Sequence, residues 1–309
     1  MNDSHYRPRD LTPVLRRAAA TFPGVVLTGP RQSGKTTLVR HVFGDSHGYC
    51  SLDDPALREM ASADPLLFLE RYPAPRIFDE IQYAPGLLHA IKLDIDAHRN
   101  DRGRFVITGS QAFPLMQGVS ESLAGRAAIL SLQSFGLREL HGDGLPDVAP
   151  ADLLLGTETQ QPHTAPDTNA RLRYLLRGGF PEPALRDDLD ARLWHASYIQ
   201  TYLERDLRSL RAVGDLVDFQ RFLVALSVRM GALVSWSDIA RDLGISNKTV
   251  SAWVSVLETS GQATRVMPYF ANVGKRLVKR PKVYLSDVGV LSYLLGIKDR
   301  ETLLGSAAA

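Results

Sequence analysis

The sequence predicts an α/β fold, in which a parallel sheet is covered by helices on both faces and is followed by a helical segment and a small third part. Short β-branched runs alternate with runs of helical periodicity from residue 24 to about residue 132, which is typical of a parallel sheet. The apolar run "GVVLT" leads directly into "GPRQSGKTT" and then into the amphipathic run "LVRHVF". After about residue 219, two short helical runs precede basic, strand-like runs.

Five runs are expected to form the sheet: "GVVLT" at 24–28, "YCSL" at 49–52, "RIFDE" at 76–80, "RFVITGS" at 104–110 and "AAILSL" at 127–132. Between the third and fourth, "LLHAIKLDIDAH" at 87–98 repeats apolar residues at helical spacing. Ligands of open parallel sheets bind at the carboxyl ends of the strands. The motifs of this chain fall at those ends, and residues 1–140 are therefore expected to form one domain.

The segment from His141 to Ala170 has a different composition, with four prolines, five acidic residues and no lysine or arginine. It is expected to be a linker or a mobile insertion. Residues 171–218 regain helical periodicity and are expected to form a helical lid. Residues 219–309 are expected to form a winged-helix domain, because "SWSDIARDLGISNKTVSAWVSVLETSG" reads as a helix-turn-helix with Ser235 and Ser246 as N-caps and Gly261 as the stop.

The spacing Gly29-x4-Gly34-Lys35-Thr36 is that of a phosphate-binding loop. The glycines permit backbone angles that turn successive N–H groups toward phosphate oxygens, and the following helix adds its positive end. Lys35 is expected to face the β- and γ-phosphates, and the Thr36 hydroxyl to bind Mg²⁺. The residues expected to contact the nucleotide are Gly29, Pro30, Arg31, Gln32, Ser33, Gly34, Lys35, Thr36 and Thr37.

Two acids, Asp79 and Glu80, end the third predicted strand. Adjacent carboxylates repel each other unless a cation or a catalytic role holds them there. Asp79 is expected to hold Mg²⁺, and Glu80 to polarise the attacking water as a catalytic residue. "FVITGSQ" ends the next strand with Thr108, Ser110 and Gln111. Of these, Ser110 is the expected catalytic sensor that orients the water, although polar residues also end strands without any catalytic role.

Arg126 precedes the fifth predicted strand, in "SLAGRAAILSL". In ATPases that act as rings, an arginine at this point reaches the γ-phosphate of a neighbouring subunit, so a homo-oligomer with Arg126 as a catalytic finger is expected. A surface or ion-paired arginine is the alternative.

ATP is the expected nucleotide, because no Asn-Lys-x-Asp motif for guanine occurs and "NKTV" at 247 lies in the helix-turn-helix. The histidines form no metal-binding pattern such as H-E-x-x-H. Cys50 is the only cysteine and the net charge is +2. With no secretory or membrane-spanning apolar run, the chain is expected to be cytoplasmic, with no membrane partner.

Several motifs together resemble the AAA-type ATPases of bacteria and archaea that are known only as ATP-binding proteins. They are "GPRQSGKTTL", "SLDDPALREMASADP", "IFDEIQYAPGLL", "FVITGSQAF", "ESLAGRAAIL", "GGFPEP" and "PYFANVGKRLVKRPKVYLSDVGVLSYLLG". The resemblance implies an additional-strand, catalytic-glutamate P-loop NTPase fold, ATP hydrolysis with Mg²⁺, and a lid motif that places Pro181 near the adenine. Relatives usually continue into a nuclease-like domain, whereas this chain stops at "LLGSAAA", so no nuclease activity is implied.

Three functions remain open at this point. Hydrolysis could drive remodelling or a nucleic-acid-associated activity, it could reset a STAND-like switch whose winged helix binds a protein, or the winged helix could be a purely structural lid. Trp253 is expected in the core, and Ser251 on the face that would read a major groove. The residues expected to contact duplex DNA are Asn247, Lys248, Lys275, Arg276, Lys279 and Arg280.

Overall fold

The computed structural model of the chain describes residues 6–110, 122–142, 167–209, 216–269 and 280–305. The chain divides into two compact units, residues 1–166 and residues 167–309. The first unit holds a five-stranded sheet, and the second holds helices and a two-stranded sheet. None of the helices in the described ranges is long and apolar enough to cross a membrane.

The sheet of the first unit consists of β1 (Gly24–Thr28), β2 (Gly48–Ser51), β3 (Arg76–Asp79), β4 (Phe105–Thr108) and β5 (Ala127–Ser131). Its order is β2-β3-β4-β1-β5, and every adjacent pair is parallel. The register sets Gly24 opposite both Phe105 and Ala127. The predicted α/β fold with a parallel sheet is confirmed, and every strand end lies within two residues of the expected one.

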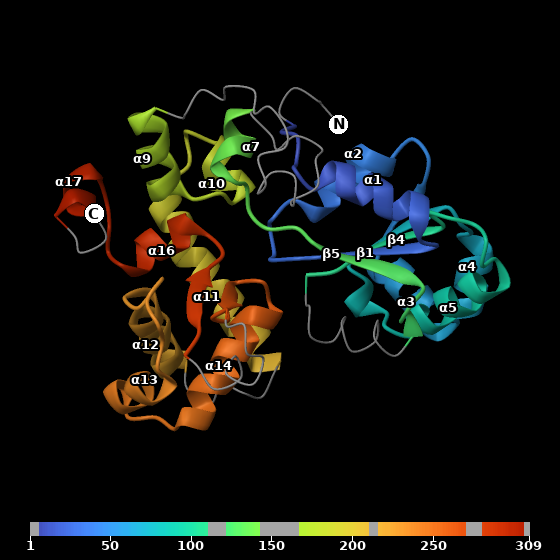
Figure 1. The fold of residues 1–309 in the computed structure, drawn as a ribbon. Coiled ribbons are helices and arrows are strands. Elements are labelled where there is room, and N and C mark those ends of the chain that lie inside the picture. The colour runs from blue at the N-terminus through green and yellow to red at the C-terminus, as the bar shows by residue number, and fades with distance from the viewer. Residues whose placement is uncertain (1–5, 111–121, 143–166, 210–215, 270–279, 306–309) are drawn as a thin grey trace. The chain divides into compact units, whose positions relative to one another are not determined.

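Helices cover both faces of this sheet (Figure 1). Val25 and Leu27 of β1 pack in one core with α1 (Thr12–Thr21) and α2 (Lys35–Phe43). Val26 points the other way, into a second core with residues of α3 (Pro55–Ala63), α4 (Pro65–Arg71) and α5 (Leu87–Ala97). Strands buried on both faces need apolar residues at successive positions, which explains the uninterrupted run in "GVVLT".

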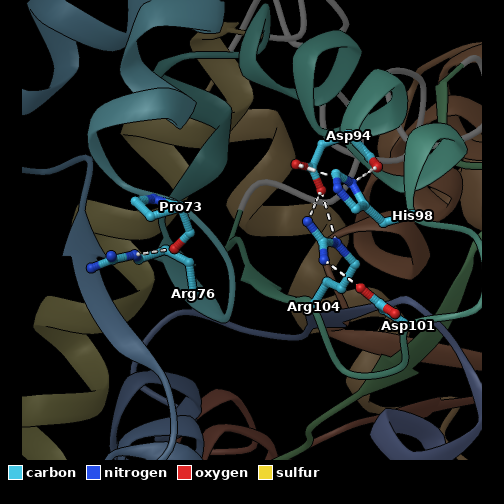
Figure 2. A network of polar contacts seen from close by, with 6 residues as sticks. All are labelled: Pro73, Arg76, Asp94, His98, Asp101 and Arg104. Atoms are coloured by element: carbon cyan, nitrogen blue, oxygen red, sulfur yellow. Dashed lines mark hydrogen bonds and ion pairs between the residues drawn. The ribbon is translucent and has the colours of Figure 1, made fainter.

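A polar network fixes the amino end of the sheet, where β4 begins (Figure 2). Arg104 donates to Asp94 of α5 through Nε at 2.8 Å and Nη2 at 2.6 Å, and to Asp101 through Nη1 at 2.8 Å. His98 also contacts Asp94, with 3.7 Å between Nδ1 and Oδ2. The network ties the end of α5 to the start of β4, opposite the edge where the candidate site residues gather.

The second unit begins with α9 (Thr168–Arg177), α10 (Pro181–Leu185) and α11 (Ala191–Ser209). Next come α12 (Leu216–Ser227), α13 (Trp236–Leu243), α14 (Asn247–Thr259), β6 (Ala263–Val266), β7 (Lys282–Leu285), α16 (Val288–Leu294) and α17 (Arg300–Leu304). Phe180 and Tyr198 share one apolar core with Phe219 and Trp253. Trp253 is therefore a core residue, as predicted. The expected boundary between residues 218 and 219 falls inside α12.

Strands β6 and β7 pair antiparallel, with Ala263 opposite Leu285. The Ser246 hydroxyl caps α14 by accepting the N–H of Thr249 at 3.0 Å. Ser235 occupies the N-cap position of α13 without a capping side-chain bond. Gly261 follows α14 with φ of 72°, in the left-handed region that favours glycine.

Candidate nucleotide site at the carboxyl edge of the sheet

The strand order brings three motifs to one edge of the first unit. The glycine-containing loop leaves β1, the acids end β3, and the polar "TGS" segment ends β4. Strand β4 pairs with both β1 and β3, so the three carboxyl ends lie next to one another. Segments far apart in the sequence therefore form a single site.

The loop after β1 has backbone angles that favour glycine at its two ends. Gly29 has φ of 137°, and a Cβ there would meet the Leu132 carbonyl oxygen at 2.1 Å. Gly34 has φ of 93° and immediately precedes α2. Gln32 has φ of 61° without being glycine. This geometry opens the loop in front of a helix N-terminus, the arrangement that binds phosphate.

Side chains elsewhere in the loop range from enclosed to exposed. Gly29, Pro30 and Ser33 are buried, whereas Gln32 and Thr37 are exposed. Of the residues predicted to contact nucleotide, 29–34 form the loop between β1 and α2, and Lys35, Thr36 and Thr37 form the start of α2. Their individual contacts with a nucleotide remain predictions.

Lys35 lies in the first turn of α2 with only 5% of its surface exposed. Its Nζ donates to the carbonyl oxygens of Gly29 at 3.0 Å and Pro30 at 2.8 Å. Burial lowers the pKa of Lys35 to about 8, against the opposing effect of the carboxylates of Glu80 and Asp79. The ammonium therefore sits inside the loop, close to both acids.

The Asp79 carboxylate accepts more side-chain hydrogen bonds than that of Glu80, and the residue is 3% exposed. Its Oδ2 accepts the hydroxyls of Thr36 at 2.8 Å and Tyr49 at 2.7 Å. Its Oδ1 accepts the hydroxyl of Thr108. Burial, followed by the bond to Asp79, raises the pKa of the Tyr49 phenol. Tyr49 escaped the sequence analysis because only the pairing of β2 with β3 brings it to Asp79.

The same contacts decide whether a magnesium ion fits here. Thr36 and Asp79 place a hydroxyl and a carboxylate oxygen side by side, and hard oxygen ligands of this kind are what Mg²⁺ prefers. Within the described residues, no cluster of three or more histidine, cysteine or acidic side chains forms a separate metal site. The residues present fit a magnesium ion bound partly by its nucleotide.

Glu80 occupies the left-handed backbone region, with φ of 57°, which is uncommon for a residue other than glycine. Its Oε2 accepts the Ser110 hydroxyl at 2.9 Å and the amide of Gln82. The Gln82 amide also lies 3.4 Å from the Ser110 hydroxyl. Ser110 thus contacts Glu80, and its role as a sensor that orients the water stays a prediction. Gln111 lies outside the described residues. Gln82, two residues beyond Glu80 in "DEIQ", was not singled out from the sequence.

Arg9 is a further residue that sequence reasoning missed. Its guanidinium donates to the Ser33 carbonyl of the loop at 2.9 Å, the Gln133 carbonyl at 2.7 Å and Glu139 of α7 (Leu137–His141) at 3.0 Å. It also lies 4.2 Å from the centre of the Phe135 ring. The side chains of Arg9 and Glu139 are only 4% and 7% exposed. Arg9 therefore links the loop to the segment that follows β5.

Comparison with known proteins agrees with this geometry. Residues 21–141 match the family model described as an AAA domain. This match falls within the first unit. Residues 169–301 match a model described as a domain of unknown function, DUF8612. The region that matches the AAA model is therefore followed by one that matches a model without an assigned role.

Two uncharacterized proteins, of Mycobacterium bovis and Mycobacterium tuberculosis, are each 34% identical to the chain over 297 residues. The match takes in 96% of this chain and 61% of each relative, so the chain spans about three fifths of their length. Among solved structures, the Walker-type ATPase PABY2304 of Pyrococcus abyssi is similar with a TM-score of 0.57 and 16% identity, over 95% of this chain and 96% of that one. At that identity the similarity shows the fold alone.

Arg126 forms an ion pair with both carboxylate oxygens of Asp96 in its own chain. Its Nε lies 2.7 Å from Oδ1 of Asp96 and its Nη2 lies 2.9 Å from Oδ2. The bond to Arg126 holds the pKa of Asp96 at about 2. The structure thus shows the ion-paired alternative. A role for Arg126 as a finger in a neighbouring subunit stays a prediction that requires this pair to open.

The remaining predicted residues lie in the second unit. Pro181 is the first residue of α10, and its contact with adenine stays a prediction. Asn247 and Lys248 are exposed in the first turn of α14, and Arg280 is exposed before β7. Three further residues predicted to contact DNA lie outside the described residues, namely Lys275, Arg276 and Lys279.

Proposed function

We propose that the protein binds ATP with Mg²⁺ at the carboxyl edge of its sheet and hydrolyses it to ADP and phosphate. The observation that carries this proposal is the pairing of two acids with different partners. Asp79 is bonded to Thr36 of the phosphate loop, whereas Glu80 is bonded to Ser110 and Gln82. One carboxylate is thereby available to the metal and the other to a water molecule.

Binding would use the loop amides, the positive end of α2 and Lys35. Among the described residues, the Lys35 ammonium donates only to loop carbonyls. It would exchange them for phosphate oxygens, which form stronger charge-assisted bonds. Thr36 and Asp79 would hold Mg²⁺. When bound, the ion neutralises charge on the β- and γ-phosphates.

Glu80 would act as the general base. Both donors to its carboxylate reach Oε2, and no described residue donates to Oε1, which leaves that oxygen for a water molecule. The water oxygen bonds to the γ-phosphorus, its proton passes to Glu80, and the bond between the γ-phosphorus and the bridging oxygen breaks to release ADP. Ser110 and Gln82 would hold the carboxylate in place during this step.

Hydrolysis would be coupled to the second unit, which we propose is a lid followed by a winged helix. A capped helix, α14, exposes Asn247, Lys248 and Ser251 on one side and buries Trp253 on the other. The pairing of β6 with β7 supplies the two strands of a wing. Duplex DNA is the partner that the basic residues favour, and a STAND-like switch that binds a protein is the alternative that a negative DNA result would support.

The test measures phosphate release from ATP by the full chain in the presence of Mg²⁺. Calorimetry measures the nucleotide affinity of the same protein. Lys35→Ala should weaken ATP binding about a hundredfold, because it removes the loop's charged donor. Lys282→Ala, which removes an exposed lysine of β7, is the matched control. Absence of turnover in the wild type, or equal ATP affinity in the two variants, would overturn the proposal.

A further inference from the structure

The second unit contains a cavity of about 390 Å³ among α9, α11 and α16. These three helices pack against one another (Figure 1). The volume lies in the range of pockets that hold small molecules. The charged residues and the histidine that line it are Arg173, Arg177, Asp190, Arg192, His195 and Lys298.

Asp190 is the one carboxylate among the described residues that line this cavity, and it accepts hydrogen bonds from backbone N–H groups. Oδ1 of Asp190 accepts the N–H groups of Arg192 at 2.9 Å and Leu193 at 3.0 Å, and so caps α11. The lining has four cationic side chains against this one carboxylate, namely Arg173, Arg177, Arg192 and Lys298.

Two of the arginines are held in place by the fold. Arg177 donates through Nε to the Pro183 carbonyl at 2.7 Å and through Nη2 to the Leu189 carbonyl at 3.0 Å. Burial, followed by the nearby charge of Arg173, lowers the pKa of Arg177. Arg173 pairs with Asp187, whose side chain is 77% exposed. These contacts hold two guanidinium groups near each other at the cavity, and the carboxylates of Asp187, Asp190 and Asp188 oppose the lowering of the Arg177 pKa.

The other two cations have no such partners. The side chains of Arg192 and Lys298 form no hydrogen bond or ion pair with any residue in the described ranges. The Arg192 guanidinium lies 5.5 Å from the centre of the Tyr293 ring, which also lines the cavity. Both cations are exposed and have donors available for a ligand.

His195 supplies a buried polar atom of a different kind. The residue is 1% exposed, and its Nε2 has no hydrogen-bond partner among the described residues. The ring bonds to the Ala191 carbonyl, which places a proton on Nδ1 and leaves a lone pair on Nε2 of the neutral ring. Burial lowers the pKa of His195 despite the opposing charge of Asp287. A ligand that offers both acceptor oxygens and one acidic proton would therefore satisfy the cations and the imidazole together.

We propose that this cavity binds the phosphate group of a small phosphorylated molecule, whose uncharged part lies against Tyr293. The second proton of a phosphate monoester dissociates with a pKa of about 6, so near that pH the group still has an O–H to offer Nε2. Its other oxygens accept from Arg192, Lys298 and Arg177. Sulfate at the same pH has no such proton, and a nucleic-acid phosphodiester has none either.

The test uses the full chain with Lys35→Ala, so that the phosphate loop contributes little to anion binding. The probes are ribose 5-phosphate, ribose and sulfate at matched ionic strength, followed by calorimetry and by the fluorescence of Trp194. The Trp194 ring meets the His195 ring edge-on at 5.3 Å, and Trp194→Phe identifies its share of the signal. Ribose 5-phosphate should saturate the site and bind more tightly than sulfate, whereas ribose should not bind.

Arg192→Gln and Lys298→Gln should each weaken ribose 5-phosphate binding about tenfold, the effect of one charge-assisted hydrogen bond. Arg221→Gln, on exposed α12 surface, is the control and should leave binding unchanged. His195→Gln should remove the preference for phosphate over sulfate. If the buried His195 variant fails to fold, the two exposed variants still decide the matter. Failure of ribose 5-phosphate to saturate, equal affinity for sulfate, or an effect of these variants on DNA binding alone would overturn the proposal.

Discussion

Removing the guanidinium of Arg9 should detach the phosphate loop from the segment after β5. Arg9→Met keeps an unbranched side chain against Phe135 but deletes the bonds to Ser33 and Gln133 and leaves Glu139 without its cation. Breaking a buried ion pair on one side costs about 3–5 kcal/mol. Since the two side chains are 4% and 7% exposed, solvent screening should reduce this figure little.

The assay is native-state hydrogen exchange of peptides from β1 and α2, which reports the free energy of opening of the first unit alone. Arg9→Met should lower that free energy by about 3–5 kcal/mol, and nucleotide affinity should fall with it. Arg9→Met combined with Glu139→Gln should recover most of the loss, because no charge is then left buried. Arg7→Met, at an exposed position, is the control.

A change below about 0.5 kcal/mol in Arg9→Met, the size expected of an ordinary surface substitution, would refute this reasoning. So would a double variant no more stable than the single one. Either result would mean that Arg9 contacts the phosphate loop without stabilising it.

Three further predictions concern charge. ATP affinity should be constant below about pH 8 and fall above it, because the lowered pKa of Lys35 means that its ammonium loses its proton there; calorimetry from pH 7 to 9.5 checks this, and a flat profile contradicts it. Arg126→Ala should bind ATP yet hydrolyse it slowly. If Arg126 leaves Asp96 and acts in a neighbouring subunit, mixing this variant with Glu80→Gln subunits should restore part of the activity. Subunits that mix but do not complement each other would assign Arg126 to the ion pair alone. Replacing four basic residues predicted to contact DNA should flatten the dependence of log DNA affinity on log salt concentration by about 0.9 for each phosphate that the protein no longer neutralises. The residues to change are Lys275, Arg276, Lys279 and Arg280. An unchanged slope would favour a protein partner.

The sheet and the acids of the site could be predicted because their signals are local. Strand and helix periodicities alternate over short stretches, and Asp79 and Glu80 stand at the end of an apolar strand. Gly29 and Gly34 likewise belong to one local motif, whose spacing alone indicates a phosphate loop. Residue type and spacing were sufficient to predict the strands, the acids and the glycine loop, because each of these signals lies within a few consecutive positions of the sequence.

Contacts between distant segments could not be predicted in the same way. Arg9 meets Glu139 across 130 positions, and Arg126 meets Asp96 across 30. Tyr49 reaches Asp79 only because β2 pairs with β3. Each of these partners depends on strand order and packing, which the sequence pattern does not determine residue by residue.

The central claim is that Glu80 is the base for ATP hydrolysis, and single-turnover kinetics of Glu80→Gln test it most directly. Enzyme in excess of ATP and Mg²⁺ isolates the chemical step, and Glu59→Gln, at an exposed position of α3, is the matched control. Glu80→Gln should bind ATP nearly as tightly as the wild type and hydrolyse it about 10²–10⁴ times more slowly. Hydrolysis at the wild-type rate by Glu80→Gln would contradict the account.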